Sequence, residues 1–244
     1  MSTIRELEEL AMNAWPALQT LFYDGWVLRF ANGYTKRANS IHPLYPSSSD
    51  PGEKIGACEQ LYQNRNQGTV FKMTPAVQPE GLDTLLERRG YRLDSPTSVQ
   101  ILDLNLHRST SRRTIVSGTL SENWLADCCR LSGIEGRHHP TLKKMLGEPR
   151  AETGFFSIQE HGQTIACGMG AVQARHVGLF DIVTDANHRH QGYGCQLVSD
   201  LLAWGIERGA QTAYLQVMLD NQPALRLYSK LGFKESYRYW YRIR

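Results

Sequence analysis

The stretch Arg189-His190-Gln191-Gly192-Tyr193-Gly194 decides how the second half of the chain is interpreted. It lies between an apolar run, residues 177–183, and a segment whose apolar residues are spaced to share one helix face. Glycines at a strand-to-helix turn let the backbone approach a bound group closely, and the first helix amides have no intrahelical acceptor. Because the helix dipole is positive at this end, the turn suits a phosphate, and Arg189 adds a fixed positive charge. An ordinary tight turn has the same residues, so the surrounding sequence must decide.

A second segment supplies that context, because residues 221–233 read NQPALRLYSKLGF. Together the two segments resemble the GNAT family of acyl-CoA-dependent N-acyltransferases. The first family signature is Arg/Gln-x-x-Gly-x-Gly/Ala, and the second is a strand, an Asn, a short helix bearing Ala and Leu-Tyr, then Gly-Phe. Every one of those positions is filled in this sequence. The resemblance implies an α/β (α+β) fold of the GNAT type, with a mixed central sheet flanked by helices.

The composition is that of a globular protein of one large domain or two small ones, with 244 residues. The formal net charge of +3 is too small to argue for a nucleic-acid partner. The sequence has no apolar run of about eighteen residues, so we expect no membrane span. The charged N-terminus does not fit a signal peptide and instead predicts a helix whose Thr3 and Glu6 form a capping box. Five cysteines without a Cys-x-x-Cys spacing favour reduced thiols in a cytoplasmic protein.

A polar stretch without periodicity, residues 105–113, is interpreted as a linker between two modules, 1–104 and 114–244. In the second module a helix is expected to start near Ser121, and another should span residues 194–208 and stop at Gly209. The expected strands are residues 114–116, 154–159, 164–174, 177–183, 213–217 and 237–243.

The first module repeats this plan without its chemistry. Residues 82–91 parallel residues 224–233, and in this register Leu86 stands where Tyr228 stands in the second module. Upstream, residues 69–73 parallel the strand at 213–217. Two early strands are expected at residues 24–30 and 35–41, joined by a turn at Asn32-Gly33. The first module carries no Arg-x-x-Gly-x-Gly, so we interpret it as a degenerate GNAT-like domain. The alternative is a coincidence between two amphipathic helices that both end in Gly-aromatic.

N-acylation needs a neutral acceptor amine, and a lysine-like amine with a pKa of about 10.4 requires about 4.6 kcal/mol to lose its proton at pH 7. A base offsets this requirement, a hydrogen-bond donor stabilises the oxyanion, and an acid assists the departing thiolate. Tyr228 matches the family position whose phenol sits near the CoA sulfur, so it is the candidate acid. The alternative is a half-buried core tyrosine. Asn221 is expected to cap the short helix, and the resemblance implies that it also contacts the pantetheine arm or nearby water.

The resemblance also implies how the chain would hold the cofactor. Backbone groups of the strand before the turn, at Ile182, Val183 and Thr184, would pair with pantetheine and leave one amide for the thioester oxygen. The amides that would then hold the pyrophosphate are those of His190, Gln191, Gly192, Tyr193, Gly194 and Cys195. Arg189 would reach a phosphate, with a surface salt bridge as the alternative.

The proton acceptor stays open between several groups. Asp181 is a carboxylate inside an otherwise apolar strand, which is unfavourable unless the group is paired or used. A structural hydrogen bond is the alternative for this residue. His138 or His139 could act as base or bind the acceptor, although a solvated loop explains them as well. The spacing of the histidines and cysteines fits no common zinc site, so no metal is expected.

The leading hypothesis is an N-acetyltransferase that moves an acetyl group from acetyl-CoA to a primary amine by direct attack in a ternary complex. We expect a small-molecule acceptor rather than a protein, and neither a nucleic acid nor a membrane as partner. The aromatic last strand, with Tyr237, Tyr239, Trp240 and Tyr241, is expected to border the acceptor cleft or to form an edge for a homodimer. The alternatives are an acyl-CoA-binding sensor without turnover and a protein that binds another nucleotide at the glycine turn.

Overall fold

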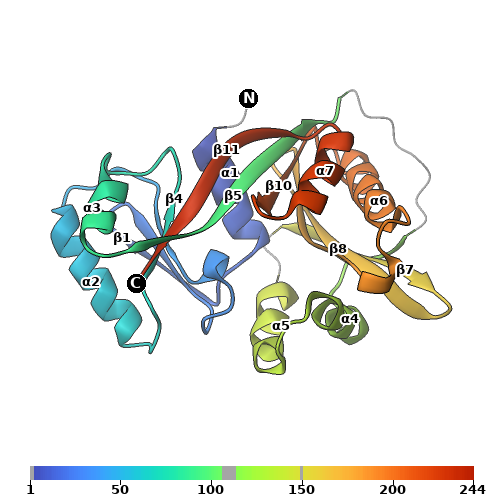
Figure 1. Ribbon diagram of the computed structural model, residues 1–244, viewed down its shortest axis with the longest axis horizontal. Coiled ribbons are helices and arrows are strands. Elements are labelled where there is room, and N and C mark those ends of the chain that lie inside the picture. Colours follow the sequence, from blue (N-terminus) through green and yellow to red (C-terminus); the bar gives the residue numbers. More distant parts are fainter. Residues whose placement is uncertain (1–2, 106–113, 149–150) are drawn as a thin grey trace. The chain divides into compact units, whose positions relative to one another are not determined.

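The computed structural model describes residues 3–105, 114–148 and 151–244 and divides into two compact units (Figure 1). Unit 1 comprises residues 1–98 and 237–244, and unit 2 comprises residues 99–236. Apart from Asn105, the linker expected at 105–113 lies outside the described residues. The sequence assigned the end of the chain to the second module, whereas its contacts group residues 237–244 with unit 1.

Unit 2 is a mixed sheet with helices on both faces, as the sequence predicted. Its strand order is β5-β10-β9-β8-β7-β6, in which β9 and β10 pair in parallel and the pairs β6–β7, β7–β8 and β8–β9 are antiparallel. Helices α4 and α5 lie on one face and α6 and α7 on the other (Figure 1). The elements are β6 Ile115–Ser117, α4 Glu122–Ser132, α5 His139–Gly147, β7 Glu152–Glu160, β8 Gln163–Gln173, β9 His176–Thr184, α6 Tyr193–Glu207, β10 Thr212–Met218 and α7 Gln222–Lys230.

Local sequence signals account for the boundaries of these elements. The Ser121 hydroxyl accepts a hydrogen bond from the Trp124 amide at 3.1 Å and so caps α4. Helix α6 ends before Gly209, whose φ of 80° lies in the left-handed region that glycine reaches without strain. Side chains alternate between the two faces along β9, so Val177 and Leu179 both face α6. There they pack with Leu201 in one buried cluster.

Unit 1 begins with the predicted capping box, because Thr3 and Glu6 exchange side-chain to backbone hydrogen bonds at 3.1 and 3.3 Å. Its strand order is β1-β2-β3-β4-β11-β5. The elements are α1 Ile4–Ala14, β1 Gln19–Tyr23, β2 Trp26–Phe30, β3 Ile41–Pro43, α2 Pro51–Gln63, β4 Val70–Met73, α3 Leu82–Arg88, β5 Arg92–Asp103 and β11 Lys234–Ile243. None of the helices in the described ranges is both long and apolar enough to cross a bilayer.

The strand expected at residues 35–41 was wrong. Asn32 and Gly33 do turn, with φ of 51° and 78°, but a short 3₁₀ helix follows at Lys36–Ala38 and β3 starts only at Ile41. The cause is Asn39, whose side-chain oxygen accepts from the amides of Ala31 at 2.7 Å and Gly33 at 2.9 Å. These bonds close the segment into a loop and leave fewer residues for the strand. The actual hairpin turn, at Asp24-Gly25, joins β1 to β2.

The similarity between the two units extends to individual hydrogen bonds. In unit 1 the Tyr91 amide donates to the Leu86 carbonyl at 3.1 Å, and in unit 2 the Phe233 amide donates to the Tyr228 carbonyl at 3.0 Å. Gly90 and Gly232 occupy the same left-handed position after the two helices, with φ of 85° and 92°. Each unit also contains a parallel strand pair, β3 with β4 and β9 with β10. The two units therefore share one plan.

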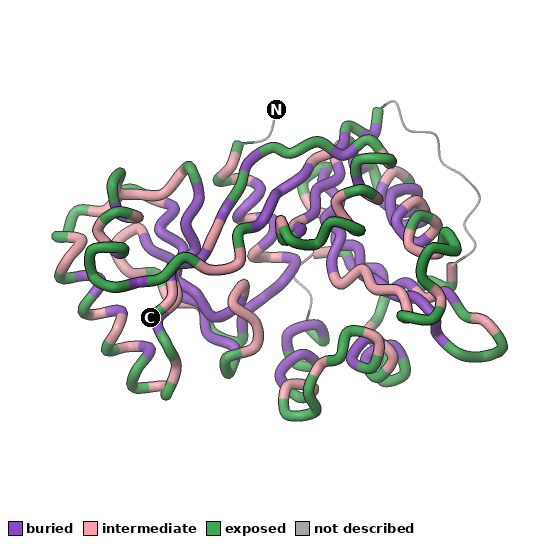
Figure 2. Tube along the Cα trace, viewed as in Figure 1, coloured by how far each residue is buried: buried purple, intermediate pink, exposed green. Residues whose placement is uncertain are grey.

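The α1 face of the unit 1 sheet carries charge. Because side chains alternate along a strand, Trp26, Leu28 and Phe30 enter the apolar core while Arg29 points to the opposite face. On that face Glu8 of α1, which is 0% exposed, accepts from Lys72 Nζ at 2.6 Å and from the Tyr237 hydroxyl at 2.7 Å. Figure 2 shows these central strands mainly as buried segments.

Two long strands, β5 and β11, have residues in both units. Residues 240–243 of β11 pair antiparallel with residues 70–73 of β4, so the end of the chain completes the sheet of unit 1. There Arg242 binds Asp83 through two bonds of 2.8 and 2.9 Å. Tyr237, Tyr239 and Tyr241 are only 3–6% exposed.

Candidate active site

The site begins where β9 departs from regular pairing. Cys167 of β8 faces Val183 and Met169 faces Phe180, so Asp181 and Ile182 together oppose Gly168. This is a β-bulge, and its first residue, Asp181, has a left-handed φ of 50°. A Cβ on Gly168 would lie 2.6 Å from Ile182 Cδ1, so a larger residue opposite the bulge would make the Ile182 side chain move. The carboxylate inside the apolar run thus lies at an irregularity that re-aims its side chain.

Beyond the bulge, β9 and β10 separate. Their parallel register ends at Leu179 and Leu215, although β9 continues to Thr184 and β10 to Met218. Strand β9 still pairs with β8 on its other side as far as Thr184. The backbone groups of residues 182–184 that face β10 are therefore the place where an extended ligand could add to the sheet.

The glycine-rich turn follows directly and starts α6. Gly192 is the N-cap residue, with a left-handed φ of 89°, and its carbonyl accepts from the Gln196 amide at 3.0 Å. The amides before Gln196 lie in the first turn, where no intrahelical acceptor exists. The Cys195 thiol and the Arg189 side chain are exposed. Arg189 forms no ion pair within the described part of the chain, which argues against the salt-bridge alternative.

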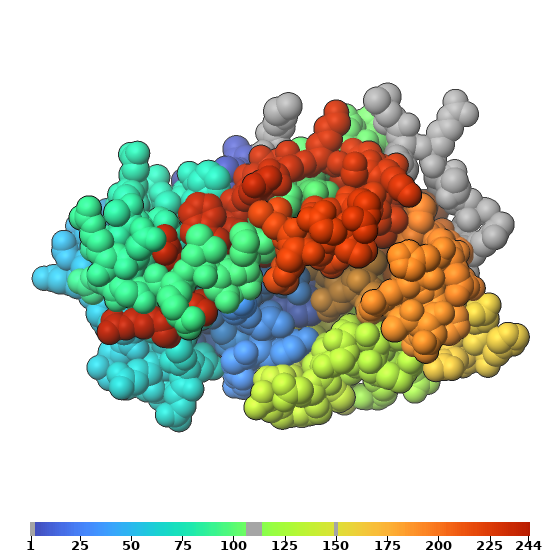
Figure 3. Space-filling model, viewed as in Figure 1, coloured from blue at the N-terminus to red at the C-terminus, as the bar shows by residue number. Residues whose placement is uncertain are grey.

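Helix α7 lies beside the start of α6 (Figure 3). A Cβ on Gly194 would be 3.4 Å from Leu227 Cδ2, which places the two helix ends in contact. Asn221 caps α7 as predicted, because its side-chain oxygen accepts from the Ala224 amide at 3.2 Å. Tyr228 is 7% exposed and packs with Phe233 at a ring-centroid distance of 5.9 Å. Burial raises the pKa of the Tyr228 phenol to about 12, so it is protonated at neutral pH.

Asp181 faces the other side of the sheet, towards α4. Burial and the nearby Asp181 charge raise the pKa of the Cys129 thiol. The pKa of Cys128 is raised by its hydrogen bond with Cys167, by burial and by the same carboxylate. Both thiols are therefore neutral and chemically quiet at pH 7. A group lying between β9 and β10 would have Tyr228 on the α6 face and Asp181 on the α4 face.

The two histidines considered as bases lie apart from this bulge in the sequence, at the start of α5. His139 begins the helix, and its Nε2 lies 3.0 Å from the Ile134 carbonyl oxygen. His138 ends a short 3₁₀ turn and is half-buried. Among the described residues, no group of three or more His, Cys, Asp or Glu side chains is arranged to hold a metal ion.

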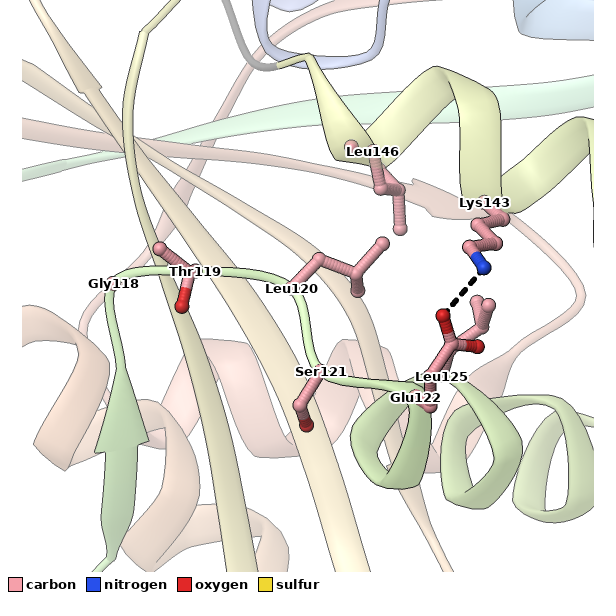
Figure 4. Close-up of a pocket in the computed structure, with 9 residues that line it drawn as sticks. Gly118, Thr119, Leu120, Ser121, Glu122, Leu125, Lys143 and Leu146 are labelled. Carbon is pink, nitrogen blue, oxygen red and sulfur yellow. Dashed lines mark ion pairs between the residues drawn. The ribbon is translucent and has the colours of Figure 1, made fainter.

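A pocket of about 250 Å³ lies elsewhere in unit 2, between the β6–α4 loop and α5 (Figure 4). Leu120, Leu125 and Leu146 contribute its apolar lining, and Lys143 forms an ion pair with Glu122 at 2.5 Å beside it. None of the candidate site residues lines this pocket. It is also small for a nucleotide-containing ligand, since ligand pockets usually measure about 300–1,000 Å³.

Sequence reasoning missed one residue beside the bulge and one beside the turn. Gly168 carries no signature of its own, and only the register of β8 against β9 shows that it lies opposite the bulge, against Ile182. Glu160 ends β7 and accepts a hydrogen bond from the Tyr193 hydroxyl at 3.1 Å. A partly exposed glutamate at a hairpin end is an ordinary surface residue in sequence, so no local signal could have identified it.

Comparison with known proteins identifies the family. The family model described as "Probable histone acetyltransferase Rv0428c C-terminal" matches residues 1–242. The chain belongs to this GNAT acetyltransferase family. A relative named "Uncharacterized N-acetyltransferase YobR", from Bacillus subtilis, is 29% identical over 250 residues, which cover all of both chains.

Solved structures of the same fold span almost the whole chain. A GCN5-related N-acetyltransferase from Kribbella flavida has a TM-score of 0.72 at 16% identity and covers 99% of this chain and 95% of its own. A tandem GNAT protein from the clavulanic acid biosynthesis pathway has a TM-score of 0.63 at 13% identity, with 98% and 87% covered. The chain is thus a GNAT acyltransferase, and its similarity to N-acetyltransferases extends over both units.

Proposed function

We propose that the protein transfers an acetyl group from acetyl-CoA to a primary amine by direct attack. The observation that carries this proposal is the separation of β9 from β10 beyond Leu179 and Leu215, immediately before the Gly192 turn. A free strand edge that leads into exposed helix amides fits a ligand with an extended amide-bearing arm and a pyrophosphate. Coenzyme A has both parts in that order.

The residues then have distinct tasks. The amides of residues 190–195 would bind the pyrophosphate, and the exposed Arg189 would supply a positive charge near it. Backbone groups of Ile182, Val183 and Thr184 would pair with the pantetheine arm, and one amide would stabilise the oxyanion. Asn221 would contact the same arm or water beside it. These interactions position the thioester next to the bulge.

Asp181 would act as the base for the amine, and Tyr228 would act as the hydrogen-bond donor to the leaving sulfur. As the amine nitrogen forms its bond to the acyl carbon, Asp181 accepts the amine proton, directly or through water. The carbon–sulfur bond breaks while the Tyr228 hydroxyl donates a hydrogen bond to the departing sulfur. Solvent then protonates the thiolate and takes the proton from Asp181. His138 or His139 would replace Asp181 as base if the acceptor approaches from α5.

We favour a small-molecule amine as the acceptor. The amine panel below includes peptides, so it tests this choice directly. A sensor without turnover is the other candidate, and it predicts CoA binding without transfer.

The deciding experiment is a free-thiol assay with acetyl-CoA across a panel of amines, amino acids and peptides. The proposal expects thiol release that depends on one class of amine. Tight CoA binding with no release on any amine would favour the sensor, and the absence of CoA binding would refute both.

Replacing Gly192 with alanine is expected to raise KM for acetyl-CoA about tenfold with little change in kcat. A Cβ at this position meets no atom within 4 Å, so the effect comes from the left-handed φ of 89° alone. That conformation is unfavourable by about 1–2 kcal/mol for other residues, and about 1.4 kcal/mol is tenfold in affinity. Gly56→Ala is the control, because this helical glycine also has open space but an ordinary φ. An unchanged KM in the variant would argue that the turn does not bind the cofactor.

A further inference from the structure

Both ends of the glycine-rich turn converge on one carboxylate, that of Glu160 at the end of β7. After the turn, the Tyr193 hydroxyl donates to Glu160 Oε1 at 3.1 Å. Before the turn, His188 Nε2 lies 3.5 Å from Glu160 Oε2. The loop of residues 189–192 is therefore flanked by His188 and Tyr193, and Glu160 of β7 contacts both side chains.

A second carboxylate, that of Asp185, contacts the other nitrogen of the His188 ring. Its Nδ1 lies 3.2 Å from Asp185 Oδ1, and the same oxygen accepts the Asn187 amide at 2.9 Å. Arg130 of α4 lies 3.9 Å from the other Asp185 oxygen and donates to the Thr164 carbonyl at 2.8 Å. The segment before the turn is thus tied to both α4 and β8.

We propose that Glu160 is a positioning residue that, through Tyr193 and His188, holds the glycine-rich turn in the conformation that receives the pyrophosphate of CoA. This inference rests on the proposed function, because it concerns the same ligand. Glu160 touches neither the reacting atoms nor the strand edge that would bind pantetheine. Its effect is therefore confined to the part of the ligand that carries the pyrophosphate.

The test compares CoA with pantetheine, which lacks the pyrophosphate and the nucleotide. Affinities are measured by calorimetry for CoA and by NMR titration for pantetheine, in the wild type and in Glu160→Ala, Glu160→Gln and Tyr193→Phe. Glu160→Ala is expected to weaken CoA binding about tenfold, since two interactions are lost, and to leave pantetheine binding within about twofold. Glu160→Gln and Tyr193→Phe should each fall between this variant and the wild type, because each retains one interaction.

Glu152→Ala is the matched control. Glu152 lies on the same strand, is exposed, and pairs with a cation, Arg208, at 2.6 Å, but it is not connected to the turn. Its removal should leave both affinities unchanged. Equal CoA affinity in Glu160→Ala and wild type, or an equal loss for CoA and pantetheine, would overturn the positioning role. Failure of the wild type itself to bind CoA would instead overturn the proposed function and this inference with it.

Discussion

Replacing Tyr228 with phenylalanine is expected to lower kcat about 100-fold while KM for acetyl-CoA changes little. Acid catalysis by a positioned side chain contributes about 10²–10⁴-fold, and the low end applies here. The pKa of the phenol is raised to about 12, so full proton transfer to a thiolate with a pKa of about 8.5 is uphill. The main benefit is then a hydrogen bond to the sulfur as negative charge develops on it.

Folding should not be affected by this change. The Tyr228 ring would remain in its contact with Phe233, and the hydroxyl donates no hydrogen bond to another described residue. Tyr45→Phe is the control, because burial likewise raises the pKa of Tyr45 to about 12 and its hydroxyl bonds Glu9 in unit 1. The measurement is steady-state kinetics with the acceptor found in the panel. A kcat within threefold of the wild type would rule out Tyr228 as the acid.

Replacing Lys72 with methionine is expected to destabilise unit 1 by about 3–5 kcal/mol, a large part of the stability of a typical domain. The ammonium group lies 2.6 Å from the carboxylate of Glu8, and the two side chains are 3% and 0% exposed. Without Lys72, Glu8 would lose its directly bonded cation and keep the Tyr237 hydroxyl, neutral His42 and the nearby charge of Arg29. A carboxylate buried in this way must take up a proton or be exposed by unfolding.

Urea unfolding at pH 7 measures this effect, and the double variant with Glu8→Gln is its control. Removing both charges should recover most of the lost free energy, since no buried charge is left without a partner. A double variant no more stable than Lys72→Met would show that lost packing, not the charge, causes the effect.

The same cluster predicts loss of stability in acid. Burial lowers the pKa of His42 to about 4 from 6.5, so the unfolded chain takes up this proton first as the pH falls below 6.5. Burial alone would raise the pKa of Glu8, but the Lys72 charge and the hydrogen bonds with His42 and Lys72 outweigh it and lower the pKa to about 2 from 4.5. Its stabilising contribution is present above 4.5 and disappears as the pH falls towards 2. The double variant has no carboxylate at position 8, so it should lose the pH dependence between 4.5 and about 2.

The glycine-rich turn and the helices beside it could be predicted from sequence because their signals are local. The turn at residues 189–194 needs glycine for backbone reasons, and the amphipathic period of α6 fixes where the helix starts. The N-cap role of Asn221 depends on atoms only three positions apart, so it too was correct. Helix α4 and strands β7 to β10 followed from their apolar periodicity in the same way.

What the sequence could not reveal depends on pairing between distant residues. The bulge at Asp181 exists only because β8 and β9 shift register there, and an apolar run with one carboxylate looks regular in sequence. Asn39 ended the expected strand through bonds to residues that precede it by several positions. Glu160 meets the turn only because β7 ends beside it.

The pairing of β11 with β4 also bears on how the protein is made. Residues 240–243, which complete the sheet of unit 1 beside residues 70–73, are synthesised after all of unit 2. Nascent domains generally fold from the N-terminus as they emerge from the ribosome. Unit 1 cannot follow that order, because the exposed edge of β4 has to wait for the end of the chain. While it waits, this open strand edge is the part of the nascent chain most prone to pair with the wrong partner, and so the part most in need of a chaperone.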